Sequence, residues 1–229
     1  MQEATDVREL DLALLFADLS GYTALTEIHG ALTASGIVLQ FCELAQASLD
    51  PGVKFINSIG DDVFCAGDST LAVVRSALKL RDAAEKEPYF PRIRMGIHRG
   101  PIVERAGRLF GAPINLTARL ADQAQGGQIL CSAPIAETVG VLAGIEARPA
   151  GERHFKNVAR PVSVFELLRL AAARAPSVID PVCRMQIEIG KAVVLIKHEG
   201  NVYRFCSRDG AEAFHKSPEL YVVTLPVGS

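Results

Sequence analysis

A short, nearly continuous apolar run, residues 10–17 (LDLALLFA), ends at Asp18 and a polar turn. A run of this length and character predicts a strand that is buried on both faces. Helical sequence follows over about residues 33–49, and Pro51-Gly52 ends it. The chain must therefore place its first strand inside a sheet that helices cover.

The later segments alternate between strand-like and helical patterns, and turn residues separate them. Residues 53–59 and 63–65 predict a hairpin around Gly60-Asp61, and Ser69 or Thr70 can cap the helix after it. We then expect a second strand pair (92–98 and 101–104) around Arg99-Gly100, a loop (106–111), a helix (115–123) and strands at 128–131 and 162–168. This order predicts an α+β fold, with helices over a mostly antiparallel sheet.

Composition narrows the class of protein. The 229 residues suffice for one large domain and one small domain. A net charge of -2 gives no pull toward nucleic acid or an anionic membrane, so neither is an expected partner. The odd number of cysteines, five, indicates reduced thiols in a cytoplasmic protein, and no apolar run is long enough for us to expect a membrane span.

Two carboxylates stand at predicted element boundaries: Asp18 after the first strand, and Asp61 in the hairpin turn. Neighbouring strands can bring both to one edge, where they could hold two divalent cations against a polyphosphate. Asp62 competes with Asp61 for this role. The backbone amides of Ser20, Gly21, Tyr22 and Thr23 would open a helix, whose N-terminus attracts phosphate. Each Asp taken alone is better explained as a turn or cap residue, so the metal role depends on the two together.

Asn115 and Arg119 are four residues apart, so they share one face of the predicted helix. An arginine there could neutralise charge that develops on a transferred phosphoryl group. Standing alone, Arg119 is better explained as an ordinary exposed arginine.

Four segments in order resemble the motifs of class III adenylate and guanylate cyclases. They are residues 16–23 (FADLSGYT), 59–61 (IGD), 95–100 (MGIHRG) and 110–120 (FGAPINLTARL). The resemblance covers about residues 10–168 and implies the ferredoxin-like cyclase fold. We therefore expect a cyclase domain over 1–169, a linker over 170–178 and a further module over 179–229.

The resemblance implies a role for each matching residue. Asp18 and Asp61 match the aspartates that bind two Mg²⁺ or Mn²⁺ ions. Asn115 matches the asparagine that orients the ribose, and Arg119 matches the arginine that stabilises the transition state. Lys156 lies near a family lysine that reaches the phosphates. In this family the sites form at a homodimer interface, and the substrate is a nucleoside triphosphate.

The two base-reading positions depart from the family pattern. Asn57 stands where adenylate cyclases have Lys, and Arg108 stands where they have Asp. The pair also differs from the Glu and Cys of guanylate cyclases. Lys54 is three residues from Asn57, so in a regular strand it should face the opposite side. The base is therefore non-standard, and pyrimidine nucleotides are candidates.

The C-terminal segment resembles a YHS domain over about residues 179–223, on residues 180–185 (DPVCRM) and 203–210 (YRFCSRDG). That family's thiols suit a soft metal. Cys183 and Cys206 are present, while Gly210 replaces a third cysteine and Arg184 replaces the box glycine. His215 or His198 could complete a site. The alternative is a packed small domain with two buried cysteines.

Three hypotheses fit these features. The first is a metal-dependent nucleotidyl cyclase with a regulatory tail. The second is a catalytically silent, dimeric sensor of the same fold, whose tail binds a metal or a partner. The third concerns the tail alone, as a redox or metal sensor that acts through Cys183 and Cys206.

Overall fold

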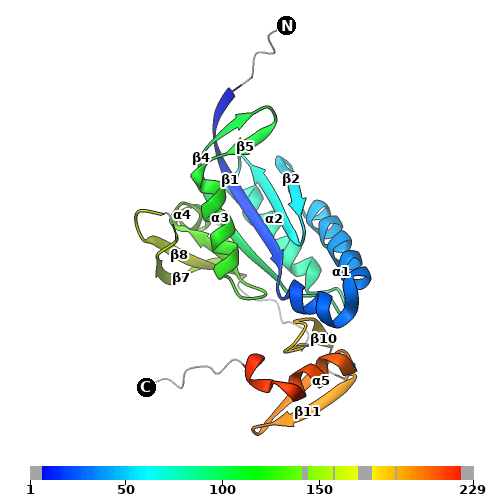
Figure 1. Ribbon diagram of the computed structural model, residues 1–229. Helices are drawn as coiled ribbons and strands as arrows, with labels where there is room; N and C mark the ends of the chain where they lie inside the picture. Colours follow the sequence, from blue (N-terminus) through cyan, green and yellow to red (C-terminus); the bar gives the residue numbers. More distant parts are fainter. Residues whose placement is uncertain (1–6, 141–143, 157, 170–176, 189, 223–229) are drawn as a thin grey trace.

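An eight-stranded sheet organises the larger part of the chain (Figure 1). The computed structural model describes residues 7–140, 144–156, 158–169, 177–188 and 190–222. Its strands follow the order β2-β3-β1-β4-β6-β8-β7, β5 pairs with β4, and only β4 and β6 run parallel. The elements are β1 (Val7–Leu19), α1 (Tyr22–Ala47), β2 (Val53–Ile59), β3 (Asp62–Gly67), α2 (Thr70–Ala84), β4 (Ile93–Arg105), β5 (Arg108–Phe110), α3 (Ala112–Gln123), β6 (Ile129–Ser132), α4 (Ala133–Val139), β7 (Ile145–Arg153) and β8 (Val162–Arg169). The predicted α+β class is confirmed.

The two faces of β1 explain its apolar run. Ala13, Leu15 and Ala17 belong to the main core, which α1, α2 and α4 cover. Leu12 and Leu14 point to the other face, in a smaller cluster with Phe64, Ala66 and Ile102. Here α3 covers only part of the sheet, packed on β4 and lying beside β1 (Figure 1). Because successive side chains alternate between faces, Asp18 lies on the same face as this smaller cluster.

The predicted turn at Arg99-Gly100 is wrong, because β4 is one strand of 13 residues that pairs with β1 throughout. Gly100 lies instead under α3, where an added Cβ would approach Pro113 Cγ to 2.8 Å. The glycines of this strand permit close helix packing and do not mark a turn. The turn is at Ala106-Gly107, with φ of 50° and 71°, and it leads into β5 inside the predicted loop.

Helix α3 packs closely on Gly96 of β4, where an added Cβ would overlap the Thr117 carbonyl oxygen and the Ala121 amide nitrogen. We expect Gly96→Ala to lower the free energy of unfolding by about 3 kcal/mol or more, because backbone atoms cannot move aside. Thermal and urea unfolding measure this. Gly36→Ala is the control, since nothing lies within 4 Å of its added Cβ inside α1. Equal stability of the two variants would refute this packing.

Helix α1 begins at Tyr22, earlier than expected, and Gly30 interrupts it with φ of 78° and ψ of 159°. By length and composition, α1 meets the criterion for a membrane-spanning helix, alone among the described residues, whereas the sequence led us to expect no span. Buried core helices and N-terminal signal sequences meet the same criterion, and 17% of the apolar window of α1 is buried. Five side chains of α1 pack in the protein interior: Leu25, Ala34, Ile37, Phe41 and Ala45.

A smaller C-terminal module follows the sheet domain. Its elements are β9 (Ser177–Ile179), β10 (Gln186–Glu188), β11 (Val194–His198), β12 (Asn201–Phe205), α5 (Arg208–Lys216) and η1 (Pro218–Leu220). Val182, Phe205, Ala211 and Phe214 form its own core. Of the predicted linker, residues 170–176 lie outside the described residues.

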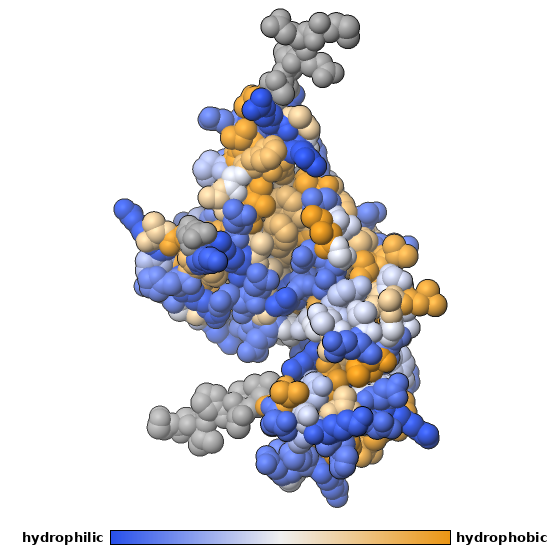
Figure 2. All heavy atoms as spheres, in the orientation of Figure 1, coloured by the Kyte–Doolittle hydropathy of each residue, from blue (hydrophilic) through white to orange (hydrophobic). Residues whose placement is uncertain are grey.

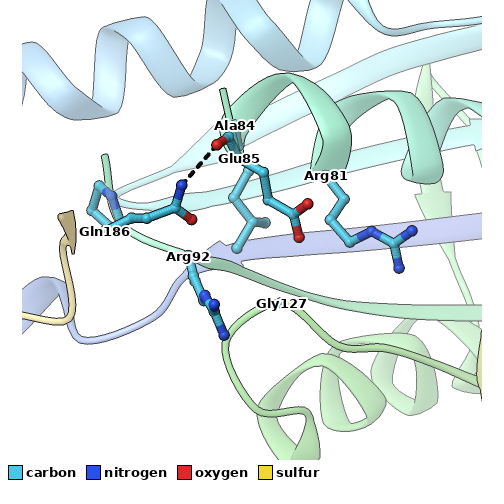
Figure 3. Close-up of a pocket in the computed structure, with 8 residues that line it drawn as sticks. Arg81, Ala84, Glu85, Arg92, Gly127 and Gln186 are labelled. Carbon is cyan, nitrogen blue, oxygen red and sulfur yellow. Dashed lines mark hydrogen bonds between the residues drawn. The ribbon is translucent and has the colours of Figure 1, made fainter. Parts of the chain in front are cut away.

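The module docks on the sheet domain. Cys183 and Met185 belong to the main core, and Met185 forms a β-bridge with Pro91. Gln186 Nε2 donates a hydrogen bond of 2.7 Å to the carbonyl oxygen of Glu85, at a small pocket between the two parts (Figure 3). None of the predicted site residues lines this pocket, whose residues come from the sheet domain and, at Gln186, from the module.

Candidate active site

Asp18 and Asp61 lie together at one end of the β1–β3 pair. Asp18 is the cross-strand partner of Asp62, which places the β2–β3 turn with Asp61 directly beside it. The Asp61 carboxyl is within hydrogen-bonding reach of the Asp18 carboxyl, and Asp18 is only 6% exposed. The structure thus brings together the two carboxylates that the sequence singled out. Asp62 lies on the same face of the sheet and is exposed, so it stays an alternative to Asp61 as a metal ligand.

Burial and the neighbouring Asp61 carboxyl raise the pKa of Asp18 from 3.8 to about 7, although the adjacent Arg94 guanidinium opposes this. Partial desolvation of the Asp62 carboxyl by its surroundings, with Asp61 and Asp122 nearby, also raises the pKa of Asp62. Crowded carboxyl groups of this kind share protons unless a cation neutralises them. Oxygen donors from two carboxylates fit Mg²⁺ or Mn²⁺, whose other ligands come from phosphate and water.

The raised pKa of Asp18 has a consequence for stability. The folded protein favours the protonated form of Asp18. The contribution of this group to the free energy of unfolding is therefore fully present below about pH 4 and is lost as the pH rises through about 7. We expect the cation-free protein to lose on the order of 3 kcal/mol from this group between pH 4 and 8. Mn²⁺ should restore stability at pH 8 and do little at pH 5.

Thermal unfolding in EDTA and in Mn²⁺ at the two pH values measures this effect. Asp18→Asn removes the titrating group, so the gain from Mn²⁺ at pH 8 should shrink in that variant. An undiminished gain would place the cation elsewhere.

Arg94 is a site residue that the sequence analysis missed. It stands opposite Asp18 in the β1–β4 register, and its Nε and Nη2 atoms contact Asp18 Oδ2. Its Nη1 donates a hydrogen bond of 3.1 Å to the carbonyl oxygen of Asp122. The sequence did offer a signal for Arg94, since this residue directly precedes the 95–100 motif. Only the pairing of β1 with β4 shows that its side chain lies beside Asp18.

The loop after Asp18 leads directly into α1. Gly21 caps the helix with φ of 84°, a conformation that favours glycine. The amide of Ser20 donates to the carbonyl oxygen of Arg92 at 2.9 Å and is therefore already used. The amides of Tyr22 and Thr23 open the helix and have no partner within it, so these two are the better phosphate donors.

The base-reading strand contains a bulge. Lys54 pairs with Ala66, whereas Asn57 pairs with Phe64, because the register shifts between Phe55 and Asn57. Ala66 and Phe64 are two residues apart, so their partners lie on the same face. The expectation that Lys54 faces away from Asn57 is therefore wrong: the extra residue at the bulge returns Lys54 to the Asp18 face.

The family model of the adenylate and guanylate cyclase catalytic domain matches residues 6–166. The chain belongs to this family. Relatives include a pH-sensitive adenylate cyclase of Mycobacterium tuberculosis, 30% identical over 69% of this chain and 41% of its own length. An adenylate cyclase of Glutamicibacter nicotianae is 30% identical over 56% of this chain and 32% of its own length. The chain thus spans about two fifths or less of these two relatives.

Solved cyclase structures share the fold. An adenylate/guanylate cyclase/hydrolase from Silicibacter pomeroyi is 26% identical, with a TM-score of 0.63 over 70% of this chain and 98% of that one. An adenylyl cyclase from P. aeruginosa is 22% identical, with a TM-score of 0.63 over 74% and 98%. These matches confirm the cyclase fold expected for the sheet domain.

The remaining predicted residues of the cyclase domain lie on α3 and nearby loops. Asn115 is exposed and Arg119 is partly buried, and within the described residues neither bonds to the Asp18 group. Lys156 is exposed, next to Phe155, which packs with Leu120 of α3. Arg108 is exposed at the start of β5. One chain therefore joins the two aspartates but does not bring Asn115 or Arg119 into contact with them.

Cys183 and Cys206 lie side by side in the module, with 3.3 Å between their sulfur atoms. Neither His215 nor His198 joins them. His198 packs against Phe214, and His215 is exposed. The third member of the group is His29 of the cyclase domain. No local spacing indicates this residue, because it lies about 150 residues before the first cysteine.

Proposed function

We propose that this protein is a metal-dependent nucleotidyl cyclase, which converts a nucleoside triphosphate into a 3′,5′-cyclic nucleotide and pyrophosphate. The contact between the buried Asp18 and Asp61 carries the proposal. Two carboxyl groups held this close in a cyclase fold, next to a helix N-terminus, suit a cation-bound polyphosphate. Because nucleoside triphosphates are intracellular, the protein would act in the cytoplasm.

Each side chain has a distinct task in this reaction. Asp18 and Asp61 would hold two Mg²⁺ or Mn²⁺ ions, which supply activation of the ribose 3′-hydroxyl and neutralise the leaving pyrophosphate. The amides of Tyr22 and Thr23 would bind phosphate oxygens, and Arg94, released from Asp18, would add positive charge there. Asn115 would orient the ribose. Arg119 would stabilise charge at the transition state, and Lys156 would contact phosphate.

A homodimer would complete the site. Apolar side chains gather beside α3 over β1 and β3, on the face that no other described helix covers (Figure 2). Ile59 at the end of β2 is 73% exposed, and Phe110 of β5 is 51% exposed. A second copy would bury this surface and bring its own Asn115 and Arg119 to the aspartates.

Asn57 would recognise the base of the nucleotide, and Lys54 would assist because the bulge places it on the same face of β2. Arg108 adds a second cation where adenylate cyclases have a carboxylate. This chemistry favours bases that present carbonyl oxygens, which include the pyrimidines. The base specificity is therefore proposed to be non-standard.

Lys54→Ala should change the ratio of kcat/KM between the best and the next triphosphate by about 10-fold, because a hydrogen bond to the base would be lost. Ser58→Ala is the matched control on the same strand, since Ser58 pairs with Val63 and faces the other side. An unchanged ratio in Lys54→Ala would remove this residue from base recognition.

One assay tests the proposed function. ATP, GTP, CTP and UTP are each offered with Mn²⁺ to protein of known oligomeric state, and cyclic nucleotide and pyrophosphate are both measured. We expect equal amounts of the two products from at least one triphosphate. Dimeric protein that is silent with all four would favour a cyclase-like sensor.

A further inference from the structure

A group of sulfur and imidazole ligands lies at the junction of the two parts of the chain. Cys206 Sγ is 3.3 Å from Cys183 Sγ, 3.6 Å from His29 Nε2 and 3.9 Å from Met185 Sδ. The His29, Cys183 and Cys206 ligand atoms all lie within 4.8 Å of one another. The module contributes the sulfur atoms, and helix α1 of the cyclase domain contributes the imidazole.

The two cysteines are held in place from behind by Asp180, which is fully buried. Its Oδ1 accepts hydrogen bonds from the amides of Val182 and Cys183 at 2.9 and 3.2 Å, and its Oδ2 accepts one from the amide of Cys206 at 2.8 Å. One carboxylate therefore fixes the backbone at both thiols. Such support is typical of preorganised ligand sites.

The ligand chemistry selects a thiophilic cation. Around tetrahedral Zn²⁺, sulfur ligands are about 3.8 Å apart and sulfur and nitrogen ligands about 3.5 Å apart. The separations of 3.3 and 3.6 Å need only small adjustments to meet these values. Thioether sulfur also suits Cu⁺, for which Met185 is a possible fourth ligand.

We infer that His29, Cys183 and Cys206 bind one thiophilic metal ion, Zn²⁺ or Cu⁺, which fastens the C-terminal module to the cyclase domain. Binding converts both thiols to thiolates and releases their two protons. The inference concerns metal binding and does not depend on turnover, so it can fail or succeed apart from the proposed function.

The site is placed to act on the loop that follows Asp18. His29 ends the first segment of α1, directly before the interruption at Gly30. That segment begins at the loop of Gly21, against which Arg184 packs: an added Cβ on Gly21 would lie 2.6 Å from Arg184 Cγ. A metal ion would therefore link Cys183, next to Arg184, with the helix segment that presents the phosphate-binding amides.

The test uses the full chain, purified under reducing conditions and loaded separately with Zn²⁺ and with Cu⁺ against a competing chelator. We expect one ion per chain, and His29→Ala should weaken binding by at least about 10-fold. His215→Ala is the matched control, because this exposed tail histidine lies outside the group. Substitution with Co²⁺ should give a thiolate charge-transfer band that weakens or shifts in His29→Ala.

A second measurement also leaves both cysteines in place, because Cys183 is buried in the core and its substitution would disturb the fold. Hydrogen exchange of wild-type protein should slow in residues 20–29 when the metal binds, and this change should be absent in His29→Ala. Equal affinity in His29→Ala and wild type would overturn the inference. So would reduced protein that binds neither ion, or a Cys183–Cys206 disulfide as the sole change at the site.

Discussion

Asp18→Asn should lower cyclase turnover by about 10³-fold or more while the protein stays folded. The carboxylate is one of two that would grip the cations, and an amide cannot replace its charge. Cyclic nucleotide formed per chain per minute, with the triphosphate that the wild type prefers, measures the loss. The effect should appear in kcat at saturating Mn²⁺, because the charge is needed at the transition state.

The fold should survive this substitution for a physical reason. Burial and Asp61 raise the pKa of Asp18 to about 7, so the fold already favours a neutral group at this position when no cation is bound. An Asn side chain supplies such a group. Cation-free Asp18→Asn should therefore unfold at pH 8 at the same temperature as wild type or higher, which separates loss of catalysis from loss of structure.

Asp61→Asn and Asp62→Asn form a matched pair, because the two carboxyls are adjacent in the chain and only Asp61 contacts Asp18. We expect Asp61→Asn to match the loss in Asp18→Asn, and Asp62→Asn to stay within a few-fold of wild type. The reverse ranking would transfer the ligand role to Asp62. Full activity in Asp18→Asn would refute the proposed catalytic site.

Local patterns were sufficient to predict much of the fold. The strand at 10–17 and the hairpin around Gly60-Asp61 appear in the structure, and of the two candidate caps Ser69 is the one used. Each depends on residues close together in the chain. Gly100 misled the prediction because a glycine that admits a helix has the same sequence signal as one that makes a turn. Only tertiary packing against α3 distinguishes the two.

The site residues that lie within sequence motifs could be predicted, whereas those placed by strand pairing or by contacts between distant segments could not. Asp18 and Asp61 followed from their places at the ends of strands. Lys54 lies on the face opposite to the one predicted, because a bulge reverses the alternation of side chains along β2. No residue pattern within 53–59 indicates that bulge. His29 meets Cys183 and Cys206 only through the docking of the C-terminal module, so its role depends on contacts between distant segments.

Two inactive variants should restore activity to each other when they are mixed. If Asp18 and Arg119 serve one site from different chains, a dimer of Asp18→Ala with Arg119→Ala has one intact site and one site that lacks both residues. Each variant alone should be inactive. Random exchange makes half of the dimers mixed, so a 1:1 mixture should recover about a quarter of wild-type activity.

The matched control mixes Asp18→Ala with Asp61→Ala. Both aspartates lie on one chain at the same site, so every dimer in this mixture has a defect in each of its sites, and no activity should return. Recovery in the first mixture alone would place the catalytic site between two copies of the chain. If exchange is shown by labelled subunits and neither mixture recovers, Arg119 must act within its own chain, and the apolar face beside α3 must have a different role from the one proposed.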